Sequence, residues 1–114
     1  MPYIKISTTE KTDKAVLEEI KAEMGRAIAL IPGKTESWLM VEIEGGCNMW
    51  LAGTSDGGCA MVDVHVFGAL DGKYANAVTA KVTDVLGEKL GLSPDRIYVK
   101  YTEYDKWGWN GSNF

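Results

Sequence analysis

The stretch AMVDVHVFG at residues 60–68 alternates valine with polar or aromatic side chains, which predicts a β-strand with one buried face. Residues 73–91, KYANAVTAKVTDVLGEKLG, then carry apolar side chains at helical spacing and end at Gly91, with Pro94 just beyond. The next stretch, DRIYVKY at residues 95–101, again predicts a strand. This order of strand, helix and strand is a βαβ unit, whose two strands run parallel.

The first half of the chain has the same order. Tyr3 to Thr8 predicts a strand, and a helix capped by Thr12 or Asp13 follows and stops before Pro32. A second strand is predicted from about Trp38 to Glu44. Two similar βαβ units predict an α/β sandwich, in which a four-stranded mixed sheet carries two helices on one face and the two halves meet antiparallel. We expect residues 1–114 to form one domain of this kind.

Gly45 and Gly46 begin a loop in which Cys47 to Leu51 predicts a short extra strand. Cys47 and Cys59 are too far apart for a CxxC motif, and the lone His65 completes no zinc ligand set with them. We therefore predict no metal and no cofactor. The two cysteines are interpreted as buried structural thiols of a cytosolic protein, with a disulfide between them as the alternative.

Charge and hydropathy exclude several classes of partner. The net charge is −4 and there is no basic run, so neither a nucleic acid nor an anionic membrane surface is expected as a partner. No charged segment precedes an apolar one at the N-terminus, and no stretch has the apolar length that spans a bilayer. These features predict a cytoplasmic protein.

The alternation in the strands gives the predicted sheet two different faces. The helix-covered face takes the aliphatic residues Ile4, Ile6, Leu39, Val41, Ile43, Val62, Val64, Val66, Ile97 and Val99. The other face carries the large side chains Tyr3, Trp38, Met40, His65, Phe67 and Tyr98 among charged ones. Because a large exposed apolar patch on a small domain usually marks an interface or a ligand groove, this face predicts a homo-oligomer.

Pro2 stands directly behind the initiator methionine, before the first predicted strand. Proline is well tolerated at the start of a strand, which is a sufficient structural explanation. Removal of Met1 by methionine aminopeptidase would also leave Pro2 with a free secondary amine. That amine is a candidate general base.

One end of the predicted sheet collects this amine, a cation and aromatic side chains. These residues are Pro2, Tyr3, Lys34, Trp38 and Phe67. Tyr98 and Lys100 begin the last strand and lie nearer the opposite end, so only a neighbouring subunit can bring Tyr98 here. The combination predicts a pocket for an aromatic anion. Taken singly, each residue has a structural explanation, since Lys34 suits a helix C-terminus and Trp38 and Phe67 suit an interface core.

Five stretches along the chain are distinctive when they are taken together: the Pro2 start, GKTESWLMVEI at 33–43, VHVFG at 64–68, LGLSPDRIYVKY at 90–101 and GWNGSNF at 108–114. With them the whole sequence closely resembles the macrophage migration inhibitory factor family of the tautomerase superfamily. The resemblance implies homotrimers with active sites between subunits and keto–enol tautomerase activity on small aromatic 2-keto acids such as phenylpyruvate. For animal members it also implies cytokine signalling and release from cells without a signal peptide.

The resemblance also implies roles for particular residues. Pro2 looks like the catalytic base, Lys34 like the partner of the substrate carboxylate, and the backbone N–H of Phe67 like a further polar contact, with Tyr98 supplied by the adjacent subunit. The positions of the family's apolar walls are taken by Trp38, Trp107, Trp109 and Phe114, and Tyr3 follows the base directly. Lys100, Phe67 and Trp107 stand where vertebrate members have asparagine, isoleucine and valine.

The predicted mechanism is removal of a proton next to a carbonyl by the neutral amine of Pro2. An aromatic pocket and a nearby cation, Lys34 or Lys100, both lower the pKa of such an amine. The alternative hypothesis is a cytokine-like signalling protein that binds a cell-surface receptor and keeps the pocket as a secondary feature. A thiol–disulfide oxidoreductase is poorly supported, because Cys59 matches the first cysteine of the vertebrate CxxC motif but Val62 stands at the second.

Overall fold

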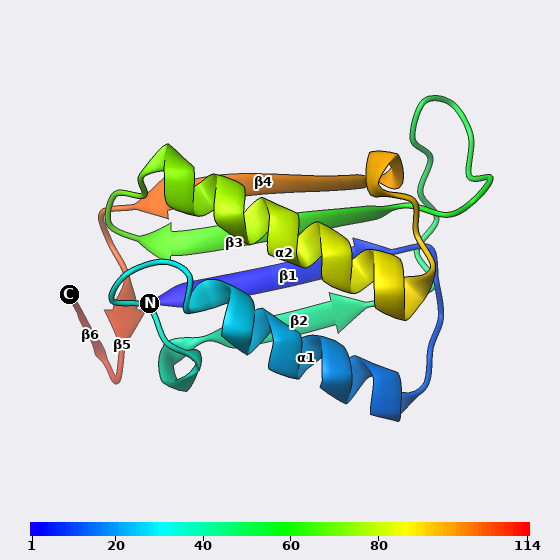
Figure 1. The fold of residues 1–114 in the computed structure, drawn as a ribbon. Helices are drawn as coiled ribbons and strands as arrows, with labels where there is room; N and C mark the ends of the chain where they lie inside the picture. Colours follow the sequence, from blue (N-terminus) through cyan, green and yellow to red (C-terminus); the bar gives the residue numbers. More distant parts are fainter.

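A computed structural model describes residues 1–114 and arranges them as a sheet of four strands with two helices on one side (Figure 1). The strands are β1 (Pro2–Thr8), β2 (Met40–Glu44), β3 (Ala60–Phe67) and β4 (Ile97–Tyr104). The helices are α1 (Lys14–Ile28) and α2 (Gly72–Leu90), and short 3₁₀ turns cover Glu36–Trp38 and Pro94–Arg96. None of the helices combines the length and the apolar character needed to cross a membrane.

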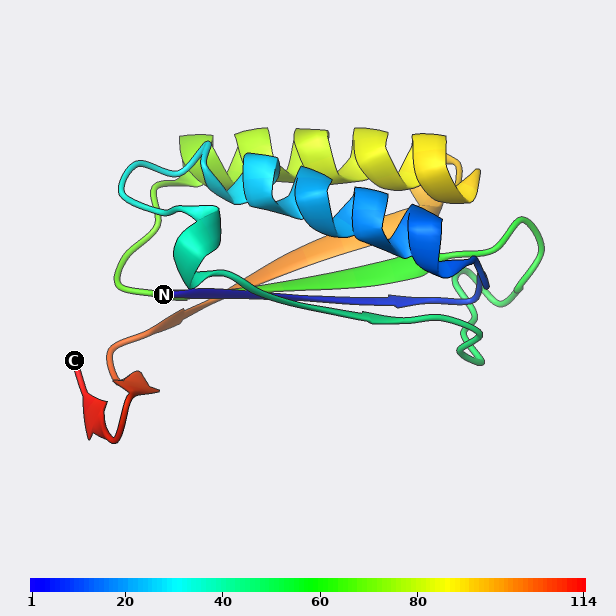
Figure 2. The same ribbon diagram turned by 90° about the horizontal axis from the view of Figure 1, so that it is seen from below.

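The sheet has the order β2-β1-β3-β4. β1 pairs in parallel with β2, β3 pairs in parallel with β4, and the central pair β1 and β3 is antiparallel, with Ile4 opposite Val64. Each half is therefore a βαβ unit, and both crossovers lie on the same side of the sheet (Figure 2). The predicted mixed sheet with its two helices on one face is confirmed.

The core lies between the sheet and the helices. The inward residues of the two central strands are fully buried: Ile4, Ile6, Val62, Val64 and Val66. They pack against Ile20, Met24, Val78, Val82 and Leu86 of the helices. Leu39, Val41, Ile43 and Val99 are only partly buried, because the outer strands lie at the margins of the helix layer.

The helix ends follow local rules. The Asp13 side chain accepts a hydrogen bond of 2.9 Å from the backbone N–H of Val16, so Asp13 rather than Thr12 caps α1. Gly91 ends α2 with a φ of 70°, the left-handed conformation that glycine adopts without steric cost.

Two predicted strand segments are different in the structure. Trp38 lies in the 3₁₀ turn and not in β2, whose pairing with β1 begins where Met40 faces Tyr3. Residues 47–51 form no strand, and Leu51 makes only an isolated bridge to Thr54. The backbone N–H of Cys47 instead donates to the carbonyl oxygen of Thr8 at 2.9 Å, which ties the start of this segment to the end of β1.

The cysteines also differ from the prediction of two buried thiols. Both are free, but only Cys59 is buried, whereas Cys47 is half-exposed and its thiol lies 3.4 Å from the carbonyl oxygen of Glu44. Cys47 is accessible because it belongs to the loop outside the sheet rather than to a paired strand.

The chain ends in a two-stranded hairpin of β5 (Gly108–Trp109) and β6 (Ser112–Asn113). Asn110 and Gly111 form its turn, with φ values of 52° and 89°. The hairpin lies on the helix-free side of the sheet, near the N-terminus (Figure 2). The Asn-Gly pair is a strong hairpin signal that the sequence analysis did not use.

Candidate active site

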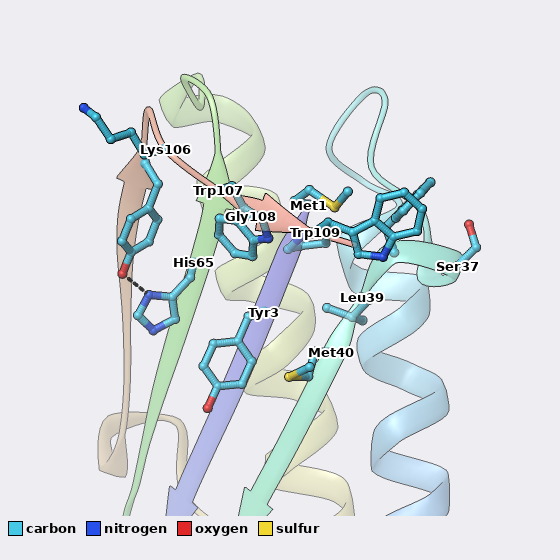
Figure 3. Close-up of a pocket in the computed structure, with 13 residues that line it drawn as sticks. Met1, Tyr3, Ser37, Leu39, Met40, His65, Lys106, Trp107, Gly108 and Trp109 are labelled. Atoms are coloured by element: carbon cyan, nitrogen blue, oxygen red, sulfur yellow. Dashed lines mark hydrogen bonds between the residues drawn. The ribbon is translucent and has the colours of Figure 1, made fainter. Parts of the chain in front are cut away.

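A cavity of about 870 Å³ opens on the helix-free side of the sheet, at the end where β1 begins (Figure 3). Its lining residues are Met1, Pro2, Tyr3, Ser37, Trp38, Leu39, Met40, His65, Tyr104, Lys106, Trp107, Gly108 and Trp109. They come from the N-terminus and β1, the 3₁₀ turn and the start of β2, β3, the end of β4 and residues 106–109, so the cavity exists only when all these segments are folded together.

Aromatic rings build the wall of this cavity nearest the hairpin. Trp38 and Trp109 meet edge to face with ring centroids 5.0 Å apart, and Trp109 stacks on Phe114 at 6.4 Å. Phe114 in turn lies 5.8 Å from Phe67 at the end of β3. Such contacts hold rings in fixed orientations and leave their faces and edges for an aromatic ligand.

Met1, Lys34 and Phe67 form a connected group at the same end of the sheet. The backbone N–H of Phe67 donates to the carbonyl oxygen of Met1 at 3.0 Å, and the Nζ of Lys34 donates to the carbonyl oxygen of Phe67 at 2.9 Å. Partial burial and the positive charge of Lys34 lower the pKa of the Met1 amine below its usual value. The N-terminal amine therefore stands in an environment that favours its neutral form.

Most of the predicted site residues are brought together. Pro2, Tyr3, Trp38, Trp107 and Trp109 line the cavity. The other predicted residues of this end, Lys34, Phe67 and Phe114, do not line the cavity but contact residues that do. Phe67 is hydrogen-bonded to Met1 and to Lys34, and Phe114 stacks on Trp109.

Tyr98 and Lys100 are not part of this arrangement within one chain. Tyr98 faces Met61 at the start of β4, and Met61 is at the far end of β3 from Phe67. Lys100 forms an ion pair of 3.1 Å with Asp63 on the neighbouring strand. Tyr98 therefore lies toward the opposite end of the sheet from Pro2, as predicted. Lys100 lies near the middle of the sheet instead, because its partner Asp63 pairs with Lys5 at the centre of β1.

The sequence analysis missed the role of two other residues in the cavity. His65 and Tyr104 both line it, and the Nδ1 atom of His65 is 2.6 Å from the hydroxyl oxygen of Tyr104 (Figure 3). The last strand was predicted to end at Tyr101, whereas β4 continues to Tyr104. Extending the alternation from Tyr98 by steps of two residues would have placed Tyr104 on the open face.

Tyr3 follows Pro2 in β1 and lies between Pro2 and the middle of the sheet. Its hydroxyl donates a hydrogen bond to the Glu42 carboxylate, which raises the pKa of Tyr3 to about 12. Its ring stacks on His65 with centroids 5.2 Å apart. Tyr3 is therefore a protonated, fixed side chain and contributes an aromatic surface rather than a base.

The chemistry available here is that of an amine, a cation and aromatic surfaces. No group of three or more His, Cys, Asp or Glu side chains lies close enough together to hold a metal ion. An amine whose pKa is lowered by burial and by a neighbouring cation suits transfer of a proton from an anionic substrate.

Comparison with known proteins identifies the family of the chain. The family model described as macrophage migration inhibitory factor matches residues 1–114. The macrophage migration inhibitory factor of Meriones unguiculatus is 30% identical over 111 residues, covering 96% of each chain. The D-dopachrome decarboxylase-B of Xenopus laevis is 27% identical over 116 residues, covering 98% of this chain and 96% of the relative.

Among solved structures, the MIF2 protein of Leishmania major superimposes with a TM-score of 0.93 over 100% of this chain and 97% of its own, at 24% identity. This likeness supports the fold, while the match of the family model to the whole sequence decides the membership. The chain belongs to the macrophage migration inhibitory factor family of the tautomerase superfamily.

Proposed function

We propose that this protein is a keto–enol tautomerase of small aromatic 2-keto acids such as phenylpyruvate, with the amine of Pro2 as its general base. The observation that carries the proposal is the position of the N-terminus. Pro2 lines an aromatic cavity, and burial and the charge of Lys34 already lower the pKa of the neighbouring Met1 amine. Removal of Met1 transfers the free amine to Pro2 in nearly the same surroundings.

The proposed reaction needs two proton transfers and no change in oxidation state. The neutral Pro2 amine takes the proton from the carbon next to the carbonyl, so that a C–H bond breaks and an N–H bond forms. The electron pair of the broken bond becomes the carbon–carbon double bond of the enolate. A proton from water completes the enol, and the protonated Pro2 amine returns its proton to the solvent. Lys34 holds the carboxylate of the substrate through a charge-assisted hydrogen bond.

Removal of Met1 also changes the hydrogen bonding of Phe67. Its backbone N–H donates to the Met1 carbonyl oxygen at 3.0 Å, and this acceptor disappears with Met1. The freed N–H then sits beside the Lys34 side chain, which is bonded to the carbonyl group of the same residue. Together they offer a charge and a donor to one carboxylate, which suits a 2-keto acid.

We further propose that the active unit is a homotrimer. Support comes from the helix-free face of the sheet, where Met40 is 67% exposed and Tyr98 is 56% exposed. Such side chains gain by burial against another copy. Tyr98 lies at the opposite end of the sheet from Pro2, so it completes the pocket only from a neighbouring subunit. Sedimentation equilibrium should return three times the chain mass, and a stable monomer or dimer at micromolar concentration would contradict the shared site.

The direct test compares the chain that begins at Pro2 with one that retains Met1, after intact-mass measurement of both. Retention turns the Pro2 amine into an amide without useful basicity and leaves Phe67 N–H occupied. We expect tautomerase turnover of phenylpyruvate to fall about 10²- to 10⁴-fold, the usual contribution of a positioned base. Equal rates for the two chains would remove Pro2 from the mechanism, and no turnover by either would refute the tautomerase proposal.

A further inference from the structure

A row of four side chains crosses the helix-free face of the sheet, with one residue from each strand: Glu42 from β2, Tyr3 from β1, His65 from β3 and Tyr104 from β4. The hydroxyl of Tyr3 donates a hydrogen bond to the Glu42 carboxylate. The rings of Tyr3 and His65 stack with centroids 5.2 Å apart, and Nδ1 of His65 lies 2.6 Å from the Tyr104 hydroxyl oxygen (Figure 3). We call these four residues the cross-strand network.

The network runs obliquely across the sheet. Tyr3 and His65 are direct cross-strand partners. Glu42 is opposite Lys5, toward the middle of the sheet, whereas Tyr104 is the last residue of β4, at the end where the cavity opens. Tyr3, His65 and Tyr104 line the cavity and Glu42 does not. The network therefore joins a carboxylate outside the cavity to three side chains within it.

The end of the network nearest the cavity mouth contacts Trp107. The Trp107 ring meets the Tyr104 ring edge to face with centroids 5.6 Å apart, and Trp107 lines the cavity. The carbonyl oxygen of Trp107 accepts a hydrogen bond of 2.9 Å from the backbone N–H of Phe114, so Trp107 also closes the C-terminal hairpin. The orientation of this part of the cavity wall depends on Tyr104, whose hydroxyl is held by His65.

Each contact in the network restricts the side chain that follows it. A hydrogen bond at a phenolic hydroxyl fixes where the tyrosine ring points, and a stacked ring limits the rotation of its neighbour. Hydrogen bonds to an ionised carboxylate are also stronger than bonds between neutral groups. The bond to Glu42 raises the pKa of Tyr3 to about 12, so Tyr3 keeps the proton that it donates. Loss of the Glu42 carboxylate should therefore loosen the network from its first member.

We propose that Glu42 is a positioning residue of the cavity, which acts on the Trp107 wall through Tyr3, His65 and Tyr104. The inference rests on the tautomerase function proposed above for its kinetic readout. It adds that a carboxylate outside the cavity sets the affinity for the ligand without contacting the ligand.

The first measurement follows the indole N–H resonance of Trp107, assigned by its loss in Trp107→Phe, in the chain that begins at Pro2. Glu42→Ala removes the acceptor of the tyrosine hydroxyl and should shift this resonance by more than its line width. Glu42→Gln keeps an acceptor oxygen and should restore most of the wild-type position.

Glu44→Ala is the matched control. Glu44 lies on the same strand and face as Glu42, but it pairs with Lys5 at 3.7 Å, outside the network. Its loss should leave the Trp107 resonance in place. Sedimentation equilibrium gives the mass of each variant, and Tyr104→Phe, which breaks the network while Glu42 is retained, replaces Glu42→Ala in this measurement if that variant loses the wild-type mass.

The second measurement is a double-mutant cycle between the two ends of the network. Glu42→Ala and Tyr104→Phe should each raise the KM for phenylpyruvate about threefold with little change in kcat, because both leave the Pro2 amine in place. The two residues lie on the outer strands and do not touch, so independent effects would multiply to about ninefold. Because both changes break the same network, the double variant should remain near threefold.

A Trp107 resonance that Glu42→Ala leaves in place, or that Glu44→Ala moves equally, overturns the inference. A ninefold rise of KM in the double variant also overturns it, while turnover of phenylpyruvate still supports the proposed function. A wild-type chain that converts no phenylpyruvate refutes the proposed function, and the Trp107 resonance then still decides whether Glu42 positions the wall.

Discussion

The two ends of the sheet are built in opposite ways. The proline end comprises Pro2, Lys34, Phe67 and residues 104–114, and it leaves aromatic surfaces around a cavity. The arginine end comprises the loop at residues 45–59 and Arg96, and there several backbone groups of the loop are hydrogen-bonded within the chain. Figure 1 shows the two ends on opposite sides of the molecule, with the N-terminus and C-terminus both at the proline end.

Arg96 holds the irregular loop at residues 45–59, which contributes no strand to the sheet. Its Nε, Nη1 and Nη2 atoms donate to the carbonyl oxygens of Gly58, Leu51 and Thr54, each at 2.8 Å. A planar guanidinium has the fixed fork of donors that such an arrangement requires. One end of the sheet therefore holds an irregular loop through hydrogen-bonded carbonyl groups, whereas the other end leaves an open cavity lined by aromatic side chains.

Among the substitutions that test this difference between the two ends, a change at Arg96 should have the largest effect, on the stability of the protein. Arg96→Ala removes three charge-assisted hydrogen bonds, and we expect the free energy of unfolding to fall by about 3 kcal/mol in urea denaturation at fixed chain concentration. Arg96→Lys should fall between the wild type and Arg96→Ala, because an ammonium group cannot reach three carbonyl groups in one fork.

Arg26→Ala provides the control for charge alone, since Arg26 pairs with Glu23 on the exposed surface of α1. Its effect on the free energy of unfolding should be about 0–1 kcal/mol. An Arg96→Ala protein as stable as Arg26→Ala would show that the loop is held by its other hydrogen bonds.

The next effect concerns binding at the proline end. Lys34→Ala should weaken binding of phenylpyruvate by about 1.5–3 kcal/mol, the range for a hydrogen bond to a charged group, as measured by titration of the chain that begins at Pro2. Lys11→Ala is the control at the arginine end, where Lys11 lies beside Gly46, and it should leave the affinity unchanged. Equal affinities of wild type and Lys34→Ala would exclude Lys34 from the site.

Two glycines with similar backbone conformations, one at each end of the sheet, allow a matched test of the difference between the ends. Gly111 and Gly53 have φ values of 89° and 81°, and an added Cβ atom would meet nothing within 4 Å at either position. Alanine should therefore cost each about 1–2 kcal/mol of local conformational energy without a clash. Only Gly111→Ala should raise the KM for phenylpyruvate, because Gly111 forms the turn of the hairpin that carries Trp109. A KM raised equally by Gly53→Ala would show that the ends are coupled.

The smallest effect is a shift in the pH profile. Burial and the charge of Lys34 lower the pKa of the Met1 amine, and we expect both causes to act on the Pro2 amine once Met1 is removed. A base is active only in its neutral form. The rise of kcat/KM with pH should therefore occur below the usual range of a terminal amine. Removing the cation in Lys34→Gln should raise the pKa of the amine and move this rise to higher pH. A profile that stays in place, or moves to lower pH, would contradict the electrostatic role of Lys34.

Some of the site could be predicted from the sequence, because it depends on strand order alone. Pro2 and Phe67 reach the same end of the sheet through the antiparallel pairing of β1 and β3. The same pairing rule places Tyr98 at the other end. Trp38 was placed correctly at the cavity although its local structure is a 3₁₀ turn, since the chain must enter β2 at that end in either case.

The remainder depends on contacts between segments far apart in the chain. The bond between His65 and Tyr104 joins β3 to the last residue of β4, and the three bonds of Arg96 hold a loop about forty residues away in sequence. Strand alternation places Tyr104 on the open face, but no local periodicity or motif predicts which side chain or backbone group either residue contacts.

By itself the sequence determined the strands, the helices and their order, because alternation, helical spacing and caps act between near neighbours in the chain. It also determined which aromatic and charged residues are available at each strand end. Only the tertiary structure decided that the segment at residues 47–51 is a pinned loop, that the Phe67 N–H is bonded to Met1, and that His65 faces the cavity with one nitrogen unpaired. These features depend on distances and directions between side chains and backbone groups that meet only after the sheet, the helices and the hairpin have packed together.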